Sequence, residues 1–305
     1  MKVDLTDTSA SEVDAALTHE RHRMGSPAVG MVLTFLIITD ERGYEGAVDA
    51  ATAAAREHPC RILAVMTGSA EGESRLDAEI HVGQGEGPGE TVLLRLYGPL
   101  SHHPASVLLP LLLTDAPVVA WWPAPAPEVP ADDRVGALAQ RRITDAASCS
   151  KTESSLVERG TGYREGDTDL AWARITPWRA LLAAALDQPH GDIVSGSVHA
   201  DRGNPSAALL AAWLADKLGI EVERETSHGP GITAVHLKLG RGEIALTRPD
   251  GRVATLSRPT QPDRQVGLHR RSMSELLVEE LRWLDTDEVY GETVQRAARD
   301  LATSL

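Results

Sequence analysis

The sequence predicts an α/β protein with two domains. In the first half, continuous apolar runs alternate with helix-like segments, which is typical of parallel strands covered on both faces. After residue 219, short alternating segments are separated by turns rich in Gly and Pro, which is typical of an antiparallel meander. The length of 305 residues also favours two domains. We therefore expect an N-terminal, doubly wound, mostly parallel sheet (Rossmann-like, without a dinucleotide loop) and a C-terminal α+β domain with a meander.

Helices and buried strands are expected to alternate in the first half. The first helix runs from about Ser9 to before Gly25, because Ser9 and Glu12 have the spacing of a capping box. Further helices are expected at residues 44–57, 105–113 and 134–142, and strands at 31–38, 61–66, 91–97 and 118–122.

A polar stretch from residue 148 to 169 separates the two halves. It predicts a boundary near residue 160, with an α/β domain at 1–160 and an α+β domain at 161–305. The second half is expected to open with a helix that has Thr176 as N-cap and Pro177 at its first position. Strands are then expected at residues 193–199, 221–226, 232–239, 243–247, 252–257 and 265–270, and helices at 205–218, 274–284 and 287–299.

Composition excludes several classes of function. A net charge of -14 opposes binding to nucleic acid or to anionic membranes. The sequence has no apolar run of the roughly 20 residues that a membrane helix needs, and no signal-peptide pattern, so a cytoplasmic protein is expected. The glycine-rich segment 83–89 is not a phosphate loop, because a strand follows it and Glu86 and Glu90 would repel phosphate. No cofactor or metal is expected.

Four of the six tryptophans lie in two short segments, and three of them are candidate contacts for a partner. Trp121 and Trp122 end an apolar strand, and they cannot both enter the same core because successive strand side chains point to opposite faces. The carboxyl ends of strands are where ligands meet open α/β sheets, and Trp is a favoured anchor in interfaces. Trp178 follows the predicted helix start. Burial in the core is the alternative for each of them.

The strongest electrostatic signal is in the second half, where residues 238–271 hold eight basic and three acidic residues. Arg252 and Arg258 have even spacing in one predicted strand and are expected to share a face. Arg179 lies beside the predicted helix start, where an anion can bind. These arginines suit an acidic partner or a sugar phosphate, and ordinary solvation of a sheet face is the alternative.

Cys60 is a candidate redox residue. His58 and Arg61 lie close to it in the sequence, and positive charge lowers the pKa of a thiol. The alternative is a small side chain that enters a buried strand.

Three segments carry a resemblance to a known family: Val-Ala-Trp-Trp-Pro at 119–123, Leu-Ala-Trp-Ala-Arg-Ile-Thr-Pro-Trp-Arg at 170–179 and Glu-Glu-Leu-Arg-Trp-Leu-Asp-Thr-Asp-Glu-Val-Tyr at 279–290. With Arg-Arg-Ile-Thr-Asp-Ala-Ala at 141–147, they resemble the glucose-6-phosphate dehydrogenase assembly protein OpcA family. The resemblance implies a non-catalytic subunit that binds this dehydrogenase and promotes its oligomerisation or activity in the oxidative pentose phosphate pathway. A sugar phosphate is a further expected effector. The alternative, supported by the arginine-rich segment, is an enzyme or sensor that acts directly on a sugar phosphate, as a lactonase or isomerase does.

Overall fold

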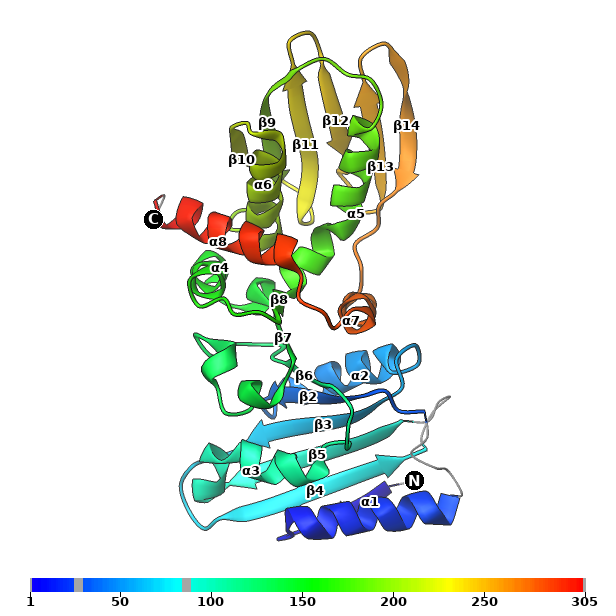
Figure 1. The fold of residues 1–305 in the computed structure, drawn as a ribbon, viewed down its shortest axis with the longest axis vertical. Helices are drawn as coiled ribbons and strands as arrows, with labels where there is room; N and C mark the ends of the chain where they lie inside the picture. Colours follow the sequence, from blue (N-terminus) through cyan, green and yellow to red (C-terminus); the bar gives the residue numbers. More distant parts are fainter. Residues whose placement is uncertain (1, 25–29, 84–88, 304–305) are drawn as a thin grey trace. The chain divides into compact units, whose positions relative to one another are not determined.

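The protein is described here from a computed structural model that covers residues 2–24, 30–83 and 89–303. The chain forms two compact units (Figure 1). Unit 1 comprises Met1–Asp145, Gly166–Thr168 and Met273–Thr286. Unit 2 comprises Ala146–Glu165, Asp169–Ser272 and Asp287–Leu305. The units are therefore not consecutive stretches of sequence, whereas the sequence predicts one boundary near residue 160.

Unit 1 is built on an eight-stranded sheet in the order β1-β4-β5-β3-β2-β6-β7-β8 (Figure 1). The strands in that order are β1 (Lys2–Leu5), β4 (Arg75–Val82), β5 (Glu90–Tyr97), β3 (Cys60–Thr67), β2 (Leu33–Thr39), β6 (Val118–Trp121), β7 (Arg141–Thr144) and β8 (Asp167–Asp169). The pairs from β5 to β7 are parallel, and β4 pairs antiparallel with both β1 and β5. The predicted mostly parallel sheet is confirmed.

Four strands of this sheet, β1, β4, β7 and β8, are absent from the sequence prediction. The expected helix at 134–142 is wrong, because a short 3₁₀ turn (Gly136–Leu138) is followed directly by β7. A Cβ on Gly136 would collide with the carbonyl of Pro130, so this position requires glycine. β4 was not predicted, because its residues alternate between buried and more exposed positions, which gives no continuous apolar run.

Four α-helices are found in the described residues of unit 1: α1 (Ala10–Met24), α2 (Tyr44–Ala54), α3 (Pro104–Leu108) and α7 (Met273–Arg282). The predicted capping box of α1 is confirmed, since Ser9 N donates to Glu12 Oε2 at 2.9 Å and Glu12 N donates to Ser9 Oγ at 3.3 Å. α7 packs against α2, and His58 Nε2 lies 3.0 Å from Val278 O.

Unit 2 is built on a six-stranded sheet in the order β10-β9-β11-β12-β13-β14 (Figure 1). The strands are β9 (Ile193–Ala200), β10 (Val222–Thr226), β11 (Ile232–Leu239), β12 (Glu243–Thr247), β13 (Val253–Arg258) and β14 (Gln261–Gly267). β10 and β9 are parallel, and all other pairs are antiparallel. The predicted meander is therefore confirmed as β11 to β14.

The helices of unit 2 are α4 (Thr152–Thr161), α5 (Leu170–Leu186), α6 (Pro205–Leu218) and α8 (Glu288–Ala302). The predicted start of α5 at Thr176 is wrong. Asp169 is the N-cap and accepts a hydrogen bond from Ala171 N at 2.8 Å, so Pro177 lies inside the helix. Proline normally breaks a helix interior. Here the buried apolar residues on both sides of Pro177 favour one continuous helix.

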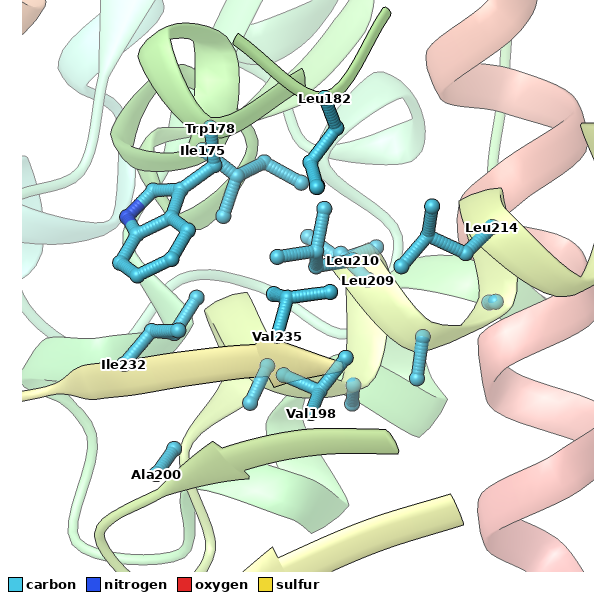
Figure 2. Close-up of a cluster of buried hydrophobic side chains, with 14 of the residues drawn as sticks. Ile175, Trp178, Leu182, Val198, Ala200, Leu209, Leu210, Leu214, Ile232 and Val235 are labelled. Atoms are coloured by element: carbon cyan, nitrogen blue, oxygen red, sulfur yellow. The ribbon is translucent and has the colours of Figure 1, made fainter. Parts of the chain in front are cut away.

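The core of unit 2 lies between the sheet and the helices α5 and α6. Figure 2 shows Trp178 and Leu182 of α5 near Leu210 of α6, with Val235 of β11 facing them. All four side chains are almost completely buried. No helix in the described parts of the chain is long and apolar enough to cross a membrane.

Candidate anion-binding site in unit 2

A cavity of about 240 Å³ lies within unit 2. Its walls come from α5, the loop between β9 and α6, the start of β11, the residue after β12 and the segment that follows β14, together with Ala147 and Thr152. We call it the arginine pocket, after five lining residues: Arg174, Arg202, Arg248, Arg270 and Arg271. Asp201 is the one acidic residue among the lining residues that the structure describes. Arginines therefore outnumber acidic residues among the residues that line the pocket.

The N-terminus of α6 forms one wall of the arginine pocket. Asn204 caps this helix, since its Oδ1 accepts a hydrogen bond from Ala207 N at 3.0 Å, and Pro205 follows at the first helical position. Asn204 Nδ2 donates to Asp201 Oδ1 at 2.8 Å, so the single acidic side chain is already engaged. The start of a 14-residue helix carries a partial positive charge, which adds to that of the arginines.

Gly231 forms a small hollow in the pocket wall. Its φ of +73° belongs to the left-handed region that favours glycine. A Cβ on this residue would lie 3.9 Å from Arg270 Nε, 3.9 Å from Asn204 Nδ2 and 4.0 Å from Arg248 Nη2. Three nitrogen donors from different segments thus lie near one point, and such a group of donors suits an oxyanion.

Arg248 is the buried member of the pocket, with 5% of its surface exposed. It donates from Nη1 to Leu268 O at 3.0 Å and from Nη2 to Ile232 O at 2.9 Å, and its Cζ lies 4.9 Å from the Trp178 ring centroid. Its Nε is buried without a hydrogen-bond partner among the described residues. Burial, and next the charge of Arg270, lower the pKa of Arg248 to about 10.

Arg202 and Arg270 are the exposed members of the pocket. Among the residues that the structure describes, neither side chain forms an ion pair or a hydrogen bond. Their guanidinium groups are therefore available to a ligand, and a guanidinium matches phosphate or carboxylate with two parallel hydrogen bonds.

The three candidate tryptophans are core residues. Trp121, Trp122 and Trp178 are 0%, 3% and 1% exposed. Trp121 stacks on Phe35 with ring centroids 6.0 Å apart, while Trp122 joins a different cluster, so the prediction that the two enter different cores is confirmed. The expectation that these rings anchor a partner is corrected, because none of the three side chains is exposed enough to contact one.

The three candidate arginines lie outside the residues that line the arginine pocket. Arg179 is in the interior of α5, where its Cζ lies 3.6 Å from the Trp172 ring centroid, so its predicted position at a helix start is wrong. Arg258 is half-buried and donates to the side chain of Gln188. Arg252 is exposed just before β13, and a contact with a partner stays a prediction for it.

Cys60 is completely buried in β3, and burial raises the pKa of its thiol to about 12. The predicted lowering by neighbouring charge is therefore wrong. Arg61 instead pairs with Glu90, with Nε 2.8 Å from Oε2. The glycine-rich segment was predicted at 83–89, and its residues 84–88 lie outside the described residues.

Sequence reasoning missed two groups of residues. Arg174 and Arg202 line the arginine pocket but lie far from the basic segment 238–271. The signal that could have found Arg202 is its position just before Asn204 and Pro205, a strong helix start. Trp283 was quoted only within a resemblance motif, yet it is 69% exposed.

The described residues thus define a two-unit α/β protein with an arginine-lined pocket beside a helix N-terminus. Two family models match consecutive parts of the chain. One, for the glucose-6-phosphate dehydrogenase subunit N-terminal domain, matches residues 51–161, and the other, for the C-terminal domain of that subunit, matches residues 165–294. The chain belongs to the OpcA family, as the resemblance implied.

Three relatives carry the name OxPP cycle protein OpcA, and two of them are 30% identical to this chain in the matched regions. The protein from Synechocystis sp. is 30% identical over 139 residues, which cover 43% of this chain and 29% of the relative. The protein from Nostoc punctiforme is 30% identical over 182 residues, which cover 54% of this chain and 39% of the relative. The matched regions therefore span well under half the length of these relatives.

Among solved structures, a mutant of the 3-ketoreductase KijD10 from Actinomadura kijaniata has a TM-score of 0.49. It is 10% identical and covers 89% of this chain and 96% of its own.

Proposed function

We propose that this chain is a non-catalytic subunit that binds glucose-6-phosphate dehydrogenase and promotes its oligomerisation or activity. The match of two family models, both described as domains of a subunit of that dehydrogenase, carries the proposal. The names of the relatives, which refer to the same oxidative pathway, support it.

A subunit without its own chemistry activates an enzyme only by binding the active conformation or assembly more tightly than the inactive one. A coupling free energy of about 1–3 kcal/mol between two binding events is typical, and it corresponds to a change of roughly 5- to 150-fold in binding affinity. The dehydrogenase must therefore respond to this chain in a saturable way.

Trp283 is our candidate anchor for the dehydrogenase. It follows α7 in unit 1 and is the most exposed of the large hydrophobic side chains among the described residues. The neighbouring Arg282 side chain is 58% exposed and lies 3.9 Å from Glu57 Oε2. Trp and Arg are the residue types that most often dominate the binding energy of interfaces. An exposed pair of this kind fits a partner surface.

The proposal is tested by mixing the purified chain with the dehydrogenase of the same organism. We expect one shared peak on a sizing column and a saturable rise in turnover by the dehydrogenase. Separate peaks together with unchanged turnover would contradict the proposal.

The anchor is tested by Trp283→Ala, with Leu109→Ala as the matched control, because Leu109 is an exposed apolar side chain of unit 1 (60%). Loss of an interface anchor costs about 2 kcal/mol or more, which is roughly a 30-fold higher Kd. The melting temperature should change little, because Trp283 has few contacts to lose. Equal affinities of the two variants would exclude Trp283 as the anchor.

The alternative is an enzyme that acts directly on a sugar phosphate, and the arginine pocket is the observation that favours it. Assaying the chain alone for lactonase and isomerase activity on sugar phosphates distinguishes the two proposals. Turnover by the isolated chain that is lost in Arg270→Gln would favour the alternative.

A further inference from the structure

Two exposed arginines of the arginine pocket, Arg202 and Arg270, form no ion pair or hydrogen bond among the described residues. The lining holds five arginines and one acidic residue, Asp201. Arg248 is buried with an unpartnered Nε among the described residues, and the α6 N-terminus adds partial positive charge. Buried or clustered like charges are costly unless a counter-charge is present. An anion that binds in this pocket would therefore be stabilised by these positive charges.

The positions of three nitrogen donors favour a compact oxyanion as the ligand. Arg270 Nε, Asn204 Nδ2 and Arg248 Nη2 all lie within 4.0 Å of the same point above Gly231. These three donors come from the segment after β14, the N-cap of α6 and the residue that follows β12. Donors from three separate segments can reach different oxygens of one phosphate group.

The volume of the cavity and its apolar lining residues indicate what kind of molecule carries the phosphate. Pro177, Ile232 and Leu268 line the cavity beside the arginines, and they offer contacts to a carbon skeleton. The volume of about 240 Å³ is slightly below the usual range of roughly 300–1,000 Å³ for ligand pockets. A small metabolite fits this volume, and a dinucleotide does not.

We propose that the arginine pocket of unit 2 binds a small phosphate monoester, with Arg202 and Arg270 as direct ligands of the phosphate and Arg248 as a buried charge behind them. The proposal goes beyond the assembly role, because the chain alone should bind the ligand in the absence of any dehydrogenase.

The experiment is calorimetric titration of the purified full chain with four probes: glucose 6-phosphate, inorganic phosphate, NADP⁺ and glucose. We expect one glucose 6-phosphate to bind per chain, inorganic phosphate to compete with it, and glucose to give no signal. NADP⁺ carries a phosphate monoester on a much larger body and should bind at least 10-fold more weakly than glucose 6-phosphate. Affinity should fall with added salt, as expected for an ionic contact.

Arg202→Gln and Arg270→Gln test the two direct ligands. Each variant should raise the Kd for glucose 6-phosphate about 10- to 100-fold, because each removes charged hydrogen bonds to the phosphate. Both side chains are exposed, so folding should be preserved. Arg264→Gln is the matched control, since Arg264 is an exposed arginine of β14 outside the pocket lining, and its Kd should change less than twofold.

Three results would overturn the proposal. The first is no binding of glucose 6-phosphate or inorganic phosphate at millimolar concentration. The second is an equal loss of affinity in Arg264→Gln and Arg270→Gln, which would indicate a general charge effect. The third is binding of an oligoglutamate peptide that Arg270→Gln abolishes while neither phosphate binds, which would assign the pocket to an acidic protein segment.

Discussion

Replacing Glu280 by leucine would leave a guanidinium buried in unit 1 without its carboxylate. Glu280 belongs to α7, and its Oε2 lies 2.6 Å from Nη2 of Arg141 in β7. The two side chains are 4% and 5% exposed. Arg141 Nη1 also donates to Asp285 O at 2.8 Å, while its Nε has no hydrogen-bond partner among the described residues.

Breaking a buried ion pair from one side costs about 3–5 kcal/mol, because the remaining charge stays buried and uncompensated. We expect this cost for Glu280→Leu and a similar one for Arg141→Met. Burial raises the pKa of Glu280, although the charge of Arg141 opposes that shift. The cost of desolvation therefore offsets much of the attraction between the two charges. The free energy of unfolding of the double variant Arg141→Met/Glu280→Leu should therefore lie within about 1 kcal/mol of the wild-type value.

Urea unfolding of the four proteins at pH 7 measures these free energies. The coupling energy between the two sites should be several kcal/mol, so that the double variant is more stable than either single variant. Additive losses in the double variant would refute the reasoning, because they would mean that each side chain stabilises the fold independently of the other.

Two further predictions rest on close packing and on burial. Gly160→Ala should lower the free energy of unfolding by about 1–3 kcal/mol, because a Cβ there would collide with Ala298 Cβ in α8, whereas Gly46→Ala in α2, with open space around it, should raise it by about 0.5–1 kcal/mol. Thermal unfolding checks both signs, and a stabilising Gly160→Ala would contradict the packing of α4 on α8. Burial raises the pKa of the Cys60 thiol to about 12, so the thiol stays protonated at pH 8 and iodoacetamide should not modify it in the native protein. Mass spectrometry should detect a Cys60 adduct only after unfolding in urea, and rapid native labelling would show that β3 opens.

Elements with complete local signals could be predicted from the sequence. α6 begins with the Asn204 cap and Pro205, and it ends at Gly219, which has a φ of +65°. Each of these residues suits its position for a local reason, so the predicted range of 205–218 matches the helix. The turn at Gly231 and the alternating pattern likewise fix the start of β11.

Elements that depend on distant residues could not be predicted in this way. Asp169 caps α5, but it also accepts a hydrogen bond from Ala146 N at 2.9 Å, a contact that no local pattern reveals. The sequence around Pro177 offers a good local helix start, and that signal is overridden by the buried apolar residues before it. β7 places two arginines in buried ion pairs, although Arg at consecutive positions is normally a sign of exposure.

The candidate site could likewise be predicted only in part, because a local charge count finds some of its residues and the tertiary fold brings in the others. The basic segment 238–271 was identified by counting charges, and it contributes Arg248, Arg270 and Arg271 to the arginine pocket. Even spacing selected Arg252 and Arg258 instead, because strand periodicity describes which residues share a face and not which ones surround a cavity. Convergence requires the loop before α6 to bring Arg202 toward residues that follow β12 and β14. A charge count can therefore locate the unit that holds the candidate site, whereas the residues that line the pocket follow only from the path of the loops.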